Sequence, residues 1–373
     1  MVVGAGITGV ALARRLTVEG MSVLLVERGH HGSGASGRNA GFLLTGVAAN
    51  YATATRQYGR PRAAEIWQFT LDNHRLLAEA LQGRDTGYRR GGSWLVPASP
   101  EERDQLLESA ALLREDRLPG EWREEGPASD GGPAGGLFNN LDGELDPSRA
   151  VTAIATMLPS GVLSEGRAVT AIESGAGTVR VHFDQGEVEA GRVVLATNGY
   201  TPRLVPALPV RAVRAQMLAT APVSRVITDR PVYSDFGYRY WRQLEDGCVL
   251  LGGCRNTAFD AEVGDDDSPT EPLQSRLDEH LRALGVVASV THRWAGTMGF
   301  TPDELPLVGR VPGGGEVYVC GGYSGHGLGF AMNAVKCLVD SWGQGTIPGW
   351  LDAARFAPER ERSASGDESR AAT

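Results

Sequence analysis

Hydrophobic and polar positions along the chain follow two periods, and their order predicts a mixed α/β protein. Short apolar runs have the length and composition of buried strands, at 21–26, 162–165 and 192–197. Apolar residues at helical spacing predict helices over 7–15, 62–81, 147–157, 271–284 and 328–342. Strand-like segments at 210–220, 233–242 and 248–252 predict a second sheet, and 93–96 is also strand-like.

The stretch from Val2 to Gly9 carries a dinucleotide-binding pattern. Gly4 permits a tight turn, Gly6 allows close backbone approach to a pyrophosphate, and Gly9 lets the next helix pack on the sheet. The following strand ends on Glu27, an acid placed to accept hydrogen bonds from a ribose. Because only three residues precede Gly4, we expect that part of the first strand is missing from this sequence.

The element order predicts an α/β fold, α+β overall, with two domains. A Rossmann-type domain is assembled from 1–45, 147–205 and 290–345, and a substrate domain with a mixed or antiparallel sheet comprises 46–146 and 206–289. Residues 294–309, rich in Pro and Gly, are expected to be irregular. The acidic run 265–267 is expected to be a solvated loop, and 356–373 to be disordered.

Residues 30–41 are too rich in Gly and Ser for a helix or a central strand. A flexible linker is one interpretation, but Arg38 and Asn39 stand between glycines and lead directly into an apolar patch. We therefore favour a ligand loop made largely of backbone. Arg38 either pairs with a phosphate of that ligand or makes no ligand contact.

Composition and charge limit the classes of binding partner that this protein is expected to have. The net charge of −9 disfavours nucleic acid and anionic membranes, and no apolar run approaches the length of a membrane span. The four cysteines form no C-x-x-C pair and the seven histidines no H-x₃-H pattern, so we predict reduced thiols, a cytoplasmic location and no metal.

Four motifs together resemble the FAD-dependent D-amino-acid oxidase and glycine oxidase (DAO) superfamily over nearly the whole chain. They are the glycine pattern with Glu27, the loop 34–41, the segment 194–200, and the segments 301–309 and 321–327. The resemblance implies FAD. The residues it assigns to the cofactor are Gly4, Gly6, Ile7, Thr8, Gly9, Glu27, Arg28, Ser36, Arg38, Asn39, Gly41, Val169, Thr197, Gly322, Gly325, His326, Gly327 and Leu328.

Two positions depart from the sarcosine oxidases of this superfamily. Gly296 stands where those enzymes link the flavin to a cysteine, and no cysteine lies within 294–306, so we expect non-covalent FAD. Gly329 replaces the lysine that binds the substrate carboxylate, which makes a small amino acid a less attractive substrate. The segments 198–202, 240–255 and 294–303 instead look like the γ-glutamylputrescine oxidase branch, which oxidises amines.

The resemblance implies oxidation of a C–N bond by hydride transfer to flavin N5, giving an imine and, with O₂ as acceptor, H₂O₂. Candidate catalytic residues are Tyr240, Arg242 and His326, although each is also explained by packing. Strand alternation would direct Tyr240 and Arg242 to one face and Trp241 to the other. Arg242 and Arg255 are candidate anchors for an acidic group remote from the reacting nitrogen.

Two alternatives remain open. One is an FAD dehydrogenase that passes electrons to a quinone or carrier protein, and the other is a flavin subunit with little activity outside a hetero-oligomer. An NAD enzyme is disfavoured, because it would not require the glycine-rich loop at 321–329. The sequence does not identify the amine.

Overall fold

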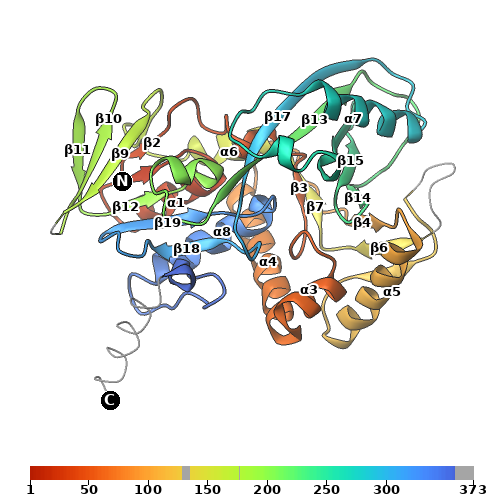
Figure 1. Cartoon of the computed structure of the whole chain (residues 1–373), viewed down its shortest axis with the longest axis horizontal. Helices are drawn as coiled ribbons and strands as arrows, with labels where there is room; N and C mark the ends of the chain where they lie inside the picture. Colours follow the sequence, from red (N-terminus) through yellow and green to blue (C-terminus); the bar gives the residue numbers. More distant parts are fainter. Residues whose placement is uncertain (128–134, 176, 358–373) are drawn as a thin grey trace.

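The structure is a computed structural model that describes residues 1–127, 135–175 and 177–357. The tail expected to be disordered lies outside the described residues from position 358 onward. Two lobes lie side by side, one around each of two large sheets (Figure 1).

The first lobe is built on a six-stranded sheet whose strands come from three separated parts of the chain. Its order is β18 (Leu307–Arg310), β19 (Val317–Gly321), β12 (Val193–Leu195), β1 (Val2–Val3), β2 (Leu25–Val26) and β8 (Leu163–Ser164). All neighbours pair in parallel except β18 with β19. The resulting arrangement is the Rossmann-type sheet that the glycine pattern predicts.

Both faces of this sheet are covered. On one face lie α1 (Ile7–Val18), α6 (Pro147–Ala155), α8 (Gly327–Asp340) and α4 (Arg60–Leu81), which share one apolar core. On the other face lies a three-stranded antiparallel sheet of β9 (Val169–Ser174), β10 (Val179–Phe183) and β11 (Glu187–Ala190). Burial on both faces explains why the strands of the large sheet read as continuous apolar runs.

The second lobe contains an eight-stranded sheet. Its order is β17 (Val290–Phe300), β13 (Arg211–Thr220), β16 (Val249–Gly253), β15 (Arg239–Gln243), β14 (Val232–Ser234), β4 (Ser93–Val96), β6 (Gly136–Asn139) and β5 (Glu121–Arg123). All pairs are antiparallel except β14 with β4, so the expected mixed or antiparallel sheet is confirmed. Helix α7 (Glu271–Ala283) packs on one face through Leu273, Leu277 and Leu281.

Shorter elements connect the two lobes. The pair β3 (Phe42–Leu43) and β7 (Gly143–Glu144) lies between the large sheets (Figure 1). Of the remaining helices, α3 (Tyr51–Tyr58) packs against α5 (Pro100–Glu115), and α2 (Ala35–Arg38) packs against α6 and β17. Ser99 caps α5 by accepting a hydrogen bond from the Glu102 amide at 3.2 Å. Four 3₁₀ segments complete the fold: η1 (Asn198–Arg203), η2 (Arg255–Thr257), η3 (Asp260–Glu262) and η4 (Ala353–Phe356).

Three sequence-based expectations were wrong. Residues 294–300 are not irregular but lie within β17, because Gly296 and Gly299 serve close packing against Arg38 and η1 rather than turns. The glycine-rich loop contains one helical turn, α2. The segment 233–242 forms two strands, separated by a turn in which Asp235, Phe236 and Gly237 have positive φ.

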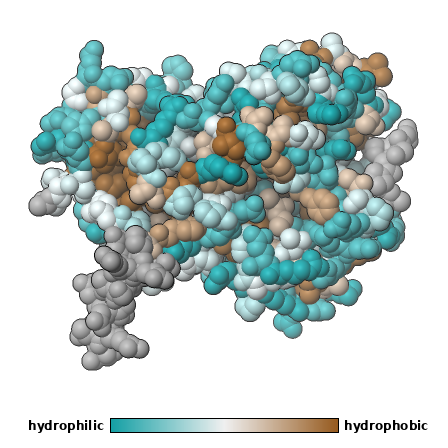
Figure 2. Space-filling model, in the orientation of Figure 1, coloured by the Kyte–Doolittle hydropathy of each residue, from teal (hydrophilic) through white to brown (hydrophobic). Residues whose placement is uncertain are grey.

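Hydrophilic residues surround smaller apolar patches on the face shown in Figure 2. Within the part of the chain that the structure describes, every helix is too short or too polar to cross a membrane.

Candidate cofactor and substrate site

A cavity of about 640 Å³ runs from the turn between β1 and α1 to the inner face of the eight-stranded sheet. Fifteen of the eighteen predicted cofactor residues line it; Gly9, Gly41 and Gly322 do not. Of the three candidate catalytic residues, Tyr240 and His326 line it and Arg242 does not.

The N-terminus of α1 forms one end of the cavity. Gly6 is its N-cap residue and has no side chain with which to cap the helix. A Cβ at Gly9 would lie 1.8 Å from the Gly4 carbonyl oxygen, so only glycine lets the helix pack this closely against the turn. The Glu27 carboxylate accepts hydrogen bonds from the Ala5 and Gly29 amides, both at 2.9 Å, and is therefore held at the end of β2.

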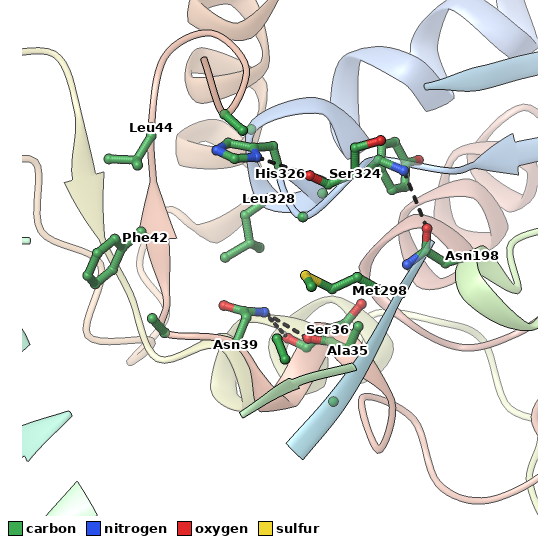
Figure 3. Close-up of a pocket in the computed structure, with 18 of the residues that line it drawn as sticks. Ala35, Ser36, Asn39, Phe42, Leu44, Asn198, Met298, Ser324, His326 and Leu328 are labelled. Atoms are coloured by element: carbon green, nitrogen blue, oxygen red, sulfur yellow. Dashed lines mark hydrogen bonds between the residues drawn. The ribbon is translucent and has the colours of Figure 1, made fainter. Parts of the chain in front are cut away.

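The glycine-rich loop contacts the same helix end. Ser36 Oγ accepts a hydrogen bond from the Ile7 amide at 2.9 Å. Asn39 donates to the carbonyls of Ala35 and Ser36 at 3.0 and 2.9 Å, and accepts from the Gly41 amide at 2.7 Å. Figure 3 shows Ser36 and Asn39 on one side of the pocket, with Met298 beside them. These hydrogen bonds fix the shape of the loop.

The N-terminus of α8 also opens on the cavity. Its N-cap is His326, whose side chain makes no capping hydrogen bond. Asn198, with a φ of 46°, accepts hydrogen bonds from the Gly322 and Tyr323 amides at 3.0 and 3.4 Å (Figure 3). Tyr323 in turn shares a hydroxyl hydrogen bond of 2.9 Å with Thr8, so the two helix ends are tied together.

These features fit FAD. Two helix N-termini face one cavity, and neither has an acidic residue in its first turn. Such ends attract anionic groups, one suiting the pyrophosphate and the other the pyrimidine carbonyls of the flavin. Glu27 lies where a ribose would be bound, and Val169 lines the cavity near it.

Aromatic side chains form the opposite end of the cavity. The ring centroids of Phe42, Tyr233 and Tyr240 lie 5.4 to 6.2 Å apart, and the His326 ring stacks on Tyr233 at 6.3 Å. A Cβ at Gly252 would come within 2.3 Å of the Tyr240 ring, so that glycine makes room for it.

Burial sets the protonation states at this aromatic end. It raises the pKa of Tyr240 to about 12, also raises the pKa of Tyr233, and lowers the pKa of His326 below its ordinary value. All three side chains are therefore neutral at pH 7.

The expected alternation along β15 is confirmed, but its two inward residues differ. Tyr240 reaches the cavity, whereas Arg242 lies behind Gly41 and pairs with Glu144 at 3.4 Å. Trp241 faces the other way and packs against His280 with ring centroids 5.3 Å apart. Arg242 is thus placed next to the cavity wall rather than in it.

Positions 296 and 329 have little room for a side chain. A Cβ at Gly296 would lie 3.2 Å from Arg38 Cβ, and a Cβ at Gly329 would lie 2.9 Å from the Leu44 carbonyl oxygen. The departures from the sarcosine oxidase pattern therefore coincide with close backbone packing.

Sequence reasoning missed several cavity residues. Asp267 lines the cavity and pairs with Arg38 at 2.5 Å, while Asp265, which does not line it, pairs with Arg203 at 2.5 Å. This acidic run is therefore not simply a solvated loop. Phe42 and Leu44 also line the cavity and lie at the left of the view in Figure 3. Because Phe42 and Leu44 directly follow the glycine-rich loop, the sequence could have predicted that they line the same cavity. No local sequence pattern indicated that Met298 and Tyr233 do so.

Comparisons with known proteins agree with this geometry. The chain is 27% identical to 4-methylaminobutanoate oxidase (formaldehyde-forming) of Paenarthrobacter nicotinovorans, over 96% of this chain but 45% of that protein. It is 27% identical to γ-glutamylputrescine oxidoreductase of Escherichia coli (strain K12), over 88% of this chain and 79% of that protein.

Among solved structures, glycine oxidase from Geobacillus kaustophilus matches with a TM-score of 0.78 at 21% identity, covering 96% of this chain and 97% of that one. That likeness supports the fold. The family model described as "FAD dependent oxidoreductase" (DAO) matches residues 1–341. The family expectation is confirmed: this chain belongs to the DAO family of FAD-dependent oxidoreductases.

Proposed function

We propose that this protein oxidises a C–N bond of an amine or amino acid. The C–N bond becomes an imine, which water hydrolyses to a carbonyl compound and an amine or ammonia. The names of two relatives support this chemistry, since one is an oxidase of 4-methylaminobutanoate and the other an oxidoreductase of γ-glutamylputrescine. Bound FAD would supply the hydride acceptor at N5 and return the electron pair to O₂ as H₂O₂.

The chain's own residues would hold the cofactor and position the amine. The α1 N-terminus would bind the pyrophosphate and Glu27 the adenosine ribose, without covalent attachment. The amides at the start of α8 would stabilise negative charge at the pyrimidine end of the flavin. Phe42, Tyr233 and Tyr240 would exclude water from the reacting carbon.

One observation carries the proposal for an amine. The ring cluster of Phe42, Tyr233, Tyr240 and His326 is itself neutral, because burial keeps the two phenols protonated and His326 uncharged. A neutral amine can enter such a site at little electrostatic cost, whereas an ammonium ion would have to lose its hydration without a counter-charge. The substrate would therefore react as the free base.

The test is a substrate panel on the holoenzyme, comprising free amines, acylated amines, sarcosine, glycine and D-alanine. We expect an amine-bearing compound to bleach the flavin anaerobically faster than the small amino acids do. Fastest bleaching by sarcosine or D-alanine would contradict the substrate preference. Bleaching followed by slow reoxidation in air would favour the dehydrogenase, and no bleaching by any member would favour a subunit of a hetero-oligomer.

A further inference from the structure

Arg255 follows a corner of the backbone that is held in an unusual conformation. Gly253, the last residue of β16, has a φ of 116°, and a Cβ there would lie 2.1 Å from the Tyr238 carbonyl oxygen. Cys254 has a φ of 59°, and its amide donates to the same oxygen at 2.6 Å. A left-handed conformation in a residue other than glycine costs energy and tends to occur where a side chain must be placed for function.

The guanidinium of Arg255 lies among aromatic rings. Its carbon is 4.9 Å from the ring centre of Phe300, 5.3 Å from that of Phe259 and 5.6 Å from that of Tyr238. Within the described ranges, no carboxylate lies within ion-pairing distance of it. Glu304, which also lines the cavity, influences it only from a longer range.

Four other arginines among the described residues line the cavity: two form ion pairs, and two stack on rings away from the tyrosine cluster. Arg38 and Arg203 pair with Asp267 and Asp265. Arg28 and Arg167 stack on Tyr200 and Phe183, beside the nucleotide-binding strands. Arg255 is therefore the cavity arginine at the aromatic end that keeps its hydrogen-bond donors available.

The register of the sheet places Arg255 beyond the tyrosine cluster. Gly252 pairs with Tyr240 and Gly253 with Arg239, so the chain passes the Tyr240 ring before it reaches Arg255. The Tyr240 ring packs against Phe42 and Tyr233, and His326 stacks on Tyr233. A substrate that reaches from His326, at the start of α8, to Arg255 would therefore span the tyrosine cluster.

We propose that Arg255 binds a carboxylate of the substrate, and that this carboxylate is separated from the reacting nitrogen by an aliphatic spacer. The inference rests on the proposed function and narrows its substrate class to amines that bear a distal acid. Burial lowers the pKa of Arg255 from its ordinary value, but a guanidinium stays charged near neutrality. Its planar donors would pair with both oxygens of a carboxylate, while the rings shield that pair from water.

The first experiment compares acids with their amides. Holoenzyme is assayed with ω-(methylamino)alkanoates of three to six carbons and with the matching primary amides. We expect the wild-type protein to prefer one acid over its amide by about 10- to 100-fold in kcat/KM, because the amide lacks a charge-assisted partner. Arg255→Gln should bring this ratio close to one, mainly through KM, and Arg255→Lys should restore part of it.

The matched control is Arg276→Gln, which removes an exposed arginine of α7 that pairs with Glu279. It should retain the preference for the acid. Flavin absorbance per protein, measured for each variant, verifies that it is folded and loaded. Equal ratios in wild type and Arg255→Gln would overturn the role of Arg255.

A second experiment tests the carboxylate site by binding alone, without any catalytic turnover. Butanoate and pentanoate are titrated into the holoenzyme, and binding is followed by the change in flavin absorbance. The dissociation constant of wild type for these carboxylates should be at least tenfold lower than that of Arg255→Gln. If carboxylates bind in this Arg255-dependent way but no amine bleaches the flavin, the proposed function fails while the anion site stands. Equal carboxylate binding by both proteins would contradict the site even if amines are oxidised.

Discussion

The two ends of the cavity differ in whether the main chain or the side chains form their lining. At the end where we propose that the nucleotide binds, the lining consists of backbone amides of α1 and α8, closely packed glycines and one fixed carboxylate, that of Glu27. At the aromatic end they are side chains of β3, β14 and β15, namely Phe42, Tyr233 and Tyr240. A backbone site tolerates almost no added atom, whereas a side-chain site can change its preference residue by residue.

This contrast predicts all-or-none effects at the nucleotide end. Gly6→Val should yield protein without FAD, because a Cβ there would already lie 2.7 Å from Ser36 Oγ and branching adds more overlap. Overpacking of this kind costs about 1–3 kcal/mol before any lost phosphate contact. The measurement is flavin released by heat or acid, which also tests the non-covalent attachment.

Gly191→Val is the matched control, since Gly191 is exposed and a Cβ there meets nothing within 4 Å. It should retain full FAD. A folded Gly6→Val protein with one FAD per chain would show that the glycine pattern does not form the pyrophosphate site.

At the aromatic end the largest expected effect is on pH dependence. Raising the pH increases the fraction of neutral amine, since alkylamines have a pKa of about 10. Tyr240 keeps its proton up to about pH 12, and the lowered pKa of His326 leaves that ring neutral, so neither changes charge between pH 7 and 9. We therefore expect kcat/KM to rise about tenfold per pH unit over this range. A plateau with a midpoint near pH 7.5 would instead indicate a side-chain base.

Position 329 tests whether a lysine of the sarcosine oxidase type can be accommodated. Gly329→Lys should not create sarcosine oxidation, because its Cβ would lie only 2.9 Å from the Leu44 carbonyl oxygen. That carbonyl, and β3 directly before it, would have to move. We expect a loss of about 1–3 kcal/mol in the free energy of unfolding, measured by denaturant titration. Gly343→Lys, at an exposed position, should be close to neutral. Efficient sarcosine turnover by Gly329→Lys would contradict this account of the substrate pocket.

The smallest effect is expected at a single hydroxyl. Tyr240→Phe keeps the ring contacts with Phe42 and Tyr233 and removes one neutral hydrogen-bonding group, so amine kcat/KM should fall only about 3- to 10-fold. The slope of the pH profile should not change. Tyr318→Phe, in the six-stranded sheet, serves as the control and should leave amine kinetics unaltered. A loss of more than 1000-fold in Tyr240→Phe would assign Tyr240 a direct role in proton transfer.

The same contrast explains how far the sequence was informative. Gly4, Gly6, Gly9 and Glu27 follow one another at spacings dictated by a single turn and strand, so local pattern was sufficient to predict them. The sequence offered Arg242 and Arg255 as equal candidates for a carboxylate anchor. In the structure Arg242 pairs with Glu144 of β7 and does not line the cavity, whereas Arg255 does. β17 was misread because its glycines meet η1 and Arg38, contacts that no local pattern contains.

The six-stranded sheet also has a consequence for biosynthesis. β1 pairs with β12 and β12 with β19, so the sheet joins residues 2–3 to residues 193–195 and 317–321. The emerging N-terminal strand must therefore wait for most of the chain to leave the ribosome, which at about 5–20 residues per second is a delay of tens of seconds. During that interval the apolar strands β1 and β2 have no complete sheet to join. Because the proposed FAD site includes Gly325–Leu328, we expect FAD supplied during synthesis to stabilise this protein only near the end of translation, after that segment has emerged.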